Sequence, residues 1–120
     1  MKLIITDHIL KKELANFSLA VIKKAAHKAL TGLAKEIKSP IQHSSFRKVN
    51  ITHPSAGRSL FLVTVKNSTA ILVLIRQKND KEIVTNLLLQ NPKFQELIKR
   101  RIPKIREEIR AQKFKEYRLN

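Results

Sequence analysis

The side chains of this sequence that are best suited to chemistry are cations placed at the ends of predicted strands. Arg58, Arg76 and Lys78 lie where neighbouring strands begin or end. Guanidinium and ammonium groups gathered in this way bind a phosphate and stabilise the charge that develops on it during cleavage. RNA carries its own nucleophile, the 2′-hydroxyl, so a protein that cleaves it must supply positioning, cations and a proton acceptor. The pattern therefore favours phosphodiester chemistry on RNA.

His53 is the nearest candidate acid or base, because it begins the predicted turn 53–57, which comes just before Arg58. A polar residue exposed on a surface turn is the simpler interpretation of this histidine. We predict that the catalytic groups are Arg58, Arg76, Lys78 and His53. We predict that the RNA-binding groups are Arg47, Lys48, Lys66 and Lys81.

Other chemistries have little support in the sequence. The absence of cysteine excludes disulfides, thiol catalysis and zinc sites built from cysteine. The four histidines, His8, His27, His43 and His53, have no ligand-like spacing with each other or with carboxylates. Two glycines cannot form a phosphate-binding loop or a dinucleotide fingerprint. We therefore expect no metal ion and no cofactor.

The net charge indicates the partner class. The chain has 25 Lys and Arg residues against 9 Asp and Glu, which gives +16. A globular chain with this much self-repulsion is stabilised by a polyanion, and nucleic acid is the commonest one. An anionic membrane surface or an acidic protein serves physically too, and a merely basic protein is the remaining alternative.

The charge is distributed unevenly along the chain. No acidic residue occurs between Glu36 and Asp80, which is the region of the predicted sheet. The cations of this interval are Lys38, Arg47, Lys48, Arg58, Lys66, Arg76 and Lys78. We expect them to form one positive face of the sheet.

A second basic region follows, tempered by three glutamates, and it contains Lys99, Arg100, Arg101, Lys104, Arg106, Arg110, Lys113, Lys115 and Arg118. It is either a phosphate-binding or docking surface, or an ordinary solvated helix face with local ion pairs.

Hydrophobic periodicity predicts an α+β fold. Residues 2–6 have the β-branched, apolar character of a strand. Asp7 is a candidate helix cap, a break follows near Ser18, and an apolar stripe predicts a longer second helix that runs through Ile37 and ends at Ser39-Pro40. Two helices joined this closely form a helical hairpin.

A three-stranded antiparallel meander is expected next, with strands at residues 47–52, 59–66 and 70–76 and the last of them central in the sheet. Helical segments follow to the end of the chain, and Pro103 is expected to kink or divide them. We predict a single domain, residues 1–120, in which about 91–120 form a C-terminal helical extension. Because no apolar run is long enough for a membrane span or a signal peptide, a cytoplasmic protein is expected.

Three stretches of the sequence resemble the RelE/ParE superfamily of bacterial type II toxins. They are the Lys-rich helical hairpin of residues 10–38, the segment Ala-Gly-Arg-Ser-Leu-Phe at 56–61, and the hydrophobic strand that runs into a basic cluster at 72–81. The resemblance covers about residues 1–90. It implies a compact α+β toxin that is neutralised by an acidic or amphipathic antitoxin and that cleaves mRNA on the ribosome without a metal ion.

By position in that family, Arg58 contacts phosphate or stabilises the transition state, and Arg76 and Lys78 occupy the basic cluster after the last strand. Arg47 and Lys48 match basic residues of the second strand. Many cleaving members carry a His or Tyr just after the last strand or near the C-terminus, whereas the cluster after the last strand here has neither and Tyr117 lies far beyond it. Two alternatives therefore stay open: a ParE-like inhibitor of DNA gyrase without enzymatic activity, and a non-toxic RNA- or DNA-binding module.

Overall fold

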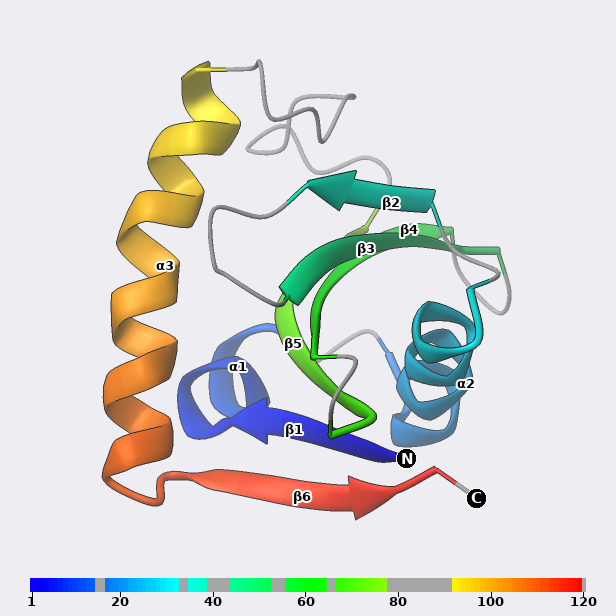
Figure 1. The fold of residues 1–120 in the computed structure, drawn as a ribbon, viewed down its shortest axis with the longest axis horizontal. Coiled ribbons are helices and arrows are strands. Elements are labelled where there is room, and N and C mark those ends of the chain that lie inside the picture. Colours follow the sequence, from blue (N-terminus) through cyan, green and yellow to red (C-terminus); the bar gives the residue numbers. More distant parts are fainter. Residues whose placement is uncertain are drawn as a thin grey trace.

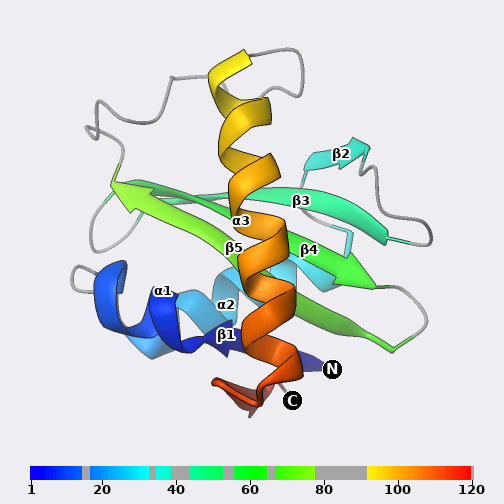
Figure 2. The same cartoon turned by 90° about the vertical axis from the view of Figure 1, so that its left-hand side faces the viewer.

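The protein forms a six-stranded mixed sheet with helices on both faces, so the α+β prediction is confirmed. The structure is a computed structural model that describes residues 1–14, 17–32, 44–52, 56–64, 67–77 and 92–119, together with the backbone of residues 35–38. The strand order in the sheet is β2-β3-β4-β5-β1-β6. The sheet curves around α2, and α3 crosses its outer face (Figure 1, Figure 2).

The first strand and the two short helices follow the sequence pattern. In β1 (Lys2–Thr6), Leu3 and Ile5 point into the core. Thr6, rather than the predicted Asp7, is the N-cap of α1 (Asp7–Lys12), and Asp7 supports the first turn by its charge. Ser18 caps α2 (Leu19–Leu30) as predicted, because its side chain accepts a hydrogen bond from the Val21 amide at 3.3 Å.

The second helix is shorter than predicted. It ends at Leu30, where Thr31 is the C-cap and Gly32 adopts a φ of +80°, a conformation that glycine provides at helix ends. Residues predicted to continue the helix form β2 (Lys35–Lys38) instead, which pairs antiparallel with β3. The prediction of a helix through Ile37 was therefore wrong. Leu33 and Ile37 continue the helical spacing of apolar residues in the sequence, but Gly32 ends the helix before them.

The antiparallel meander is confirmed. It consists of β3 (Ser44–Ile51), β4 (Gly57–Thr64) and β5 (Thr69–Gln77). β5 is central as expected, with β4 on one side and β1, in parallel, on the other. The register of β4 against β5 shifts between Leu60 and Phe61, so a bulge changes which side chains face each side after that point.

The C-terminal segment differs most from the prediction. α3 (Pro92–Arg110) is one helix that contains Pro103, and β6 (Phe114–Arg118) pairs antiparallel with β1. The helix ends because Gln112 takes a φ of +58° while the Lys113 amide bonds to the Glu108 carbonyl at 2.7 Å and the Gln112 amide to the Ile109 carbonyl at 3.1 Å. The predicted all-helical extension was therefore wrong, because this stop signal is made without glycine or proline.

Two apolar clusters pack on opposite faces of the sheet. Under α1 and α2, Ile22 and Phe61 are at the centre of a fifteen-residue cluster. Under α3, Phe94, Ile98 and Ile105 pack on side chains of β3, β4 and β5. Those sheet side chains are Phe46, Leu60, Leu62, Val73 and Leu74.

Candidate nucleic-acid interface

Strand alternation assigns the predicted cations of the sheet to faces. Arg58 and Arg76 are Cα partners in the β4–β5 ladder, and each lies two residues from a leucine of the α3-side cluster, Leu60 or Leu74. Lys48 lies two residues after Phe46 on β3, so both side chains point to the same face, and Phe46 belongs to that cluster as well. Lys48, Arg58 and Arg76 therefore share the α3 face of the sheet.

Arg47 lies on the opposite face. Its Nε donates to the Ser45 hydroxyl at 3.2 Å, and its Cα partner in β4 is Phe61, which packs in the cluster under α2. The structure thus brings together three of the predicted cations and separates the fourth. The four others, His53, Lys66, Lys78 and Lys81, lie outside the described residues.

The α3 face of the sheet is not an open platform. Phe94, Ile98 and Ile105 of α3 are 4–6% exposed and seal its apolar middle. Arg58 and Arg76, at the end of the ladder, are partly exposed. The cations open to solvent on this side therefore lie on the outer side of α3 and at the margins of the sheet rather than at its centre.

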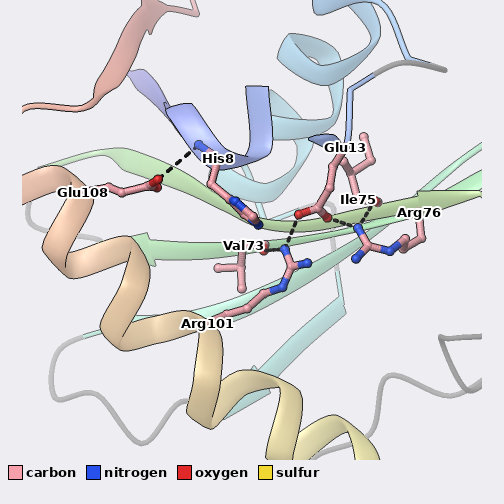
Figure 3. A network of polar contacts seen from close by, with 7 residues as sticks. All are labelled: His8, Glu13, Val73, Ile75, Arg76, Arg101 and Glu108. Carbon is pink, nitrogen blue, oxygen red and sulfur yellow. Dashed lines mark hydrogen bonds and ion pairs between the residues drawn. The ribbon is translucent and has the colours of Figure 1, made fainter. Parts of the chain in front are cut away.

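A buried carboxylate holds two guanidinium groups at one of these margins (Figure 3). Glu13, the C-cap residue of α1, has a side chain only 6% exposed and forms ion pairs with Arg76 of β5 and Arg101 of α3. The Arg101 Nη1–Glu13 Oε2 distance is 2.6 Å. The arginine side chains are 17% and 16% exposed, so solvent screens these pairs only weakly.

This cluster forms where the sheet loses a strand pairing. β1 pairs with β5 only as far as Ile71, and beyond it Arg101 donates to the Val73 carbonyl at 3.0 Å. Arg76 donates in the same stretch to the carbonyl of Ile75 at 3.0 Å. Because unpaired buried carbonyls are costly, the two arginines replace the missing strand as donors.

A histidine lies beside this cluster (Figure 3). The backbone amide of His8, in the first turn of α1, donates to Glu108 Oε1 at 3.2 Å and so joins α1 to α3. Burial lowers the pKa of the His8 imidazole below its usual value, and the cations Lys104, Lys12 and Arg101 lower it further against the opposing effect of Glu108. The neutral form of the His8 imidazole is therefore favoured.

The solvent side of α3 carries most of its charge as cations. Its exposed acidic residues are Glu96 and Glu107. Its exposed basic residues are Lys93, Lys99, Arg100, Lys104, Arg106 and Arg110. Further exposed cations follow in and before β6, namely Lys113, Lys115 and Arg118. We call the six exposed cations of α3 the cationic side of α3.

Tyr117 was predicted to lie in the C-terminal helical extension, but it is part of β6 in the sheet. It lies opposite Leu3 in the β1–β6 ladder and packs against the cluster under α2, and the Lys23 ammonium lies 5.5 Å from the centroid of its ring. It is therefore on the opposite face from Arg58 and Arg76 and does not supply an acid or base to them.

Sequence reasoning missed His8 and Glu13 as site residues, and it placed Arg101 only within the second basic region. Arg101 comes three residues after Ile98 and four before Ile105, so it occupies the buried stripe of its helix, which was a usable signal. An acidic residue at the C-terminal end of a helix, as at Glu13, opposes the helix dipole and was a second signal. The position of His8 depends on tertiary packing and carried no local signal.

The described residues contain no group of three or more His, Asp or Glu side chains that could hold a metal ion. In the same part of the chain, no helix is long and apolar enough to cross a membrane. Comparisons with models of protein families, with curated proteins and with solved structures found no match to this chain.

Proposed function

We propose that the protein binds RNA by its phosphate backbone, through the cationic side of α3. The observation that carries this proposal is the presence of six exposed Lys and Arg side chains against two exposed glutamates on one 19-residue helix. The cations extend from Lys93 to Arg110, about 25 Å along the axis at about 1.5 Å per residue. This length suits contact with several successive phosphates.

The binding is expected to be insensitive to base sequence. Base recognition of single strands uses exposed aromatic side chains as stacking platforms. In the described residues, the phenylalanines of the two clusters are buried, and Phe114 and Tyr117 are only partly exposed. Phosphate contact without stacking gives affinity that falls steeply as salt is raised.

A salt titration tests the proposal. We expect the triple substitution Lys99→Gln, Arg106→Gln and Arg110→Gln to weaken binding of a single-stranded RNA and to reduce the slope of log Kd against log salt by about 2, because each lost phosphate contact removes about 0.7. Lys11→Gln, Lys24→Gln and Lys28→Gln provide the matched control, since they remove the same charge from exposed positions of α1 and α2. An equal loss in the control would show that net charge alone drives binding.

A second candidate is the ribosome-dependent mRNA cleavage of a RelE-like toxin. The observation that favours it is the direct cross-strand position of Arg58 and Arg76 on the α3 face, with Lys48 on the same face. An antitoxin is the partner expected in that case, and complementary acidic charge is the chemistry that would recognise these cations.

Induction in bacteria with mapping of mRNA ends separates the candidates. Lys48→Ala with Arg58→Ala is the informative variant, because substitution of Arg76 would also break its ion pair with Glu13. Cleavage that disappears in this variant supports a RelE-like toxin. Intact mRNA with DNA damage supports gyrase inhibition, and normal growth supports a binding protein without toxicity.

A further inference from the structure

The junction of α1 and α3 brings a histidine, a carboxylate and several cations together. His8 of α1 lies beside Glu108 of α3, joined by the 3.2 Å hydrogen bond from the His8 amide. Cations come from both helices, because Lys12 lies one turn after His8 on α1 and Lys104 lies one turn before Glu108 on α3. Figure 3 shows the imidazole pointing toward the Glu13–Arg101 pair, away from the His8 amide.

The His8 imidazole is chemically available. Within the described residues it has no hydrogen-bond partner, because the one bond of His8 is made by its backbone amide. The side chain is partly exposed, and its neighbours Lys12 and Lys104 are exposed. Glu13 is engaged with Arg76 and Arg101, so it does not compete for the imidazole. A neutral imidazole among cations at the surface can accept a proton next to a bound phosphate.

We infer that His8 is the general base of an RNA-cleaving centre formed by α1 and α3. This inference rests on the proposed function, because Lys104 belongs to the cationic side of α3 that would hold the RNA. It differs from the sequence prediction, which placed the acid or base at His53.

The reaction is an intramolecular transfer of the phosphoryl group. His8 accepts the proton of a ribose 2′-hydroxyl, the 2′-oxygen forms a bond to the adjacent phosphorus, and the bond from phosphorus to the 5′-oxygen breaks. The products are a 2′,3′-cyclic phosphate and a 5′-hydroxyl, whose proton comes from water. Lys104 and Lys12 stabilise the negative charge that develops on the phosphoryl oxygens.

Glu108 acts as a positioning residue for this histidine. Its Oε1 accepts from the His8 amide, and its Oε2 is buried without a hydrogen-bond partner in the described part of the chain. The carboxylate thus fixes the first turn of α1 against α3. Because the bond involves the backbone of residue 8, substitution of the histidine side chain leaves this contact intact.

The test compares cleavage with binding in the full chain. A 5′-labelled RNA is incubated with the protein, alone and with ribosomes, and cyclic-phosphate ends are measured; Kd is measured separately with 2′-O-methyl RNA, which cannot react. We expect wild-type protein to cleave the RNA, and His8→Gln to cleave it at least about 100-fold more slowly with Kd unchanged within about twofold. His27→Gln, an exposed position of α2, is the matched control.

The pH profile adds a second readout. Because the pKa of His8 lies below the usual value of about 6.5, the cleavage rate should rise with pH through a midpoint below that value. Tight binding without cleavage, in either condition, would overturn the inference and leave the proposed function standing. Absence of binding would overturn both. Cleavage that survives His8→Gln and disappears with Lys48→Ala and Arg58→Ala would place the chemistry on the sheet margin instead.

Discussion

The two faces of the sheet are stabilised in different ways. The face under α1 and α2 buries fifteen apolar residues. The face under α3 buries eight, and its margin is fastened by the buried Glu13 between Arg76 and Arg101. α3 is therefore attached by a smaller apolar contact plus a polar cluster, and two cations of this face, Arg76 and Arg101, are members of that cluster.

The largest expected effect tests the difference between the two apolar clusters. Phe61→Ala removes a fully buried ring under α2 and should lower the free energy of unfolding by about 3–5 kcal/mol. Phe94→Ala, in the first turn of α3, should cost less because a helix end can fray locally. Urea unfolding measures both. Equal losses would contradict the distinction between the faces.

The next effect concerns the polar cluster. Glu13→Gln leaves two guanidinium groups facing each other without a counter-charge and should cost about 2–4 kcal/mol, less than the cost in a fully dry site. Glu116→Gln is the matched control, because its pair with Lys2 is about half exposed and should cost less than about 1 kcal/mol. If both variants lose the same small free energy of unfolding, the polar cluster does not stabilise the attachment of α3.

Substitution of a glycine by alanine tests how closely the residues under α2 are packed. A Cβ at residue 57 would lie 2.5 Å from Cζ of Phe17 and 2.9 Å from the Arg76 carbonyl oxygen, so Gly57→Ala should cost about 1–3 kcal/mol through overpacking. At Gly32 a Cβ meets nothing within 4 Å, and Gly32→Ala should cost only about 1 kcal/mol from its φ of +80°. A thermal unfolding midpoint for each variant decides between these causes.

The smallest effect is a pH dependence at the α1–α3 junction. The pKa of His8 is lower in the folded protein than in the unfolded chain, so the unfolded chain binds the proton more readily. Stability should therefore fall as pH drops below about 6.5. In urea unfolding between pH 5 and 7, His8→Gln should show a shallower decline than the wild type. An identical slope would mean that His8 is not desolvated by the junction.

Much of the fold could be predicted because its local signals agreed with its long-range packing. The meander strands alternate, the first turn of α2 has a serine cap, and α3 has an apolar stripe. The errors occurred where a helix ended without the expected signal. Gln112 takes a left-handed conformation that glycine usually adopts, and Ile37 kept a helical spacing although it belongs to a strand.

The candidate site was less predictable than the fold. The sequence identified charge and its approximate location, but the common face of Lys48, Arg58 and Arg76 also depends on the register shift between β4 and β5. It did not show that α3 covers that face, or that Glu13 reaches Arg76 and Arg101. Such contacts depend on how distant elements pack together, which local periodicity does not encode.

The position of β1 has a consequence for how the chain folds during synthesis. Residues 2–6 are made before β5 and β6, yet they lie between those two strands in the sheet. The Leu119 amide even bonds to the Met1 carbonyl, at 3.1 Å. β1 can therefore pair at both edges only after β5 and β6 have been made. Until then its backbone edges are unpaired, so a chaperone that shields residues 2–6 should raise the yield of folded protein.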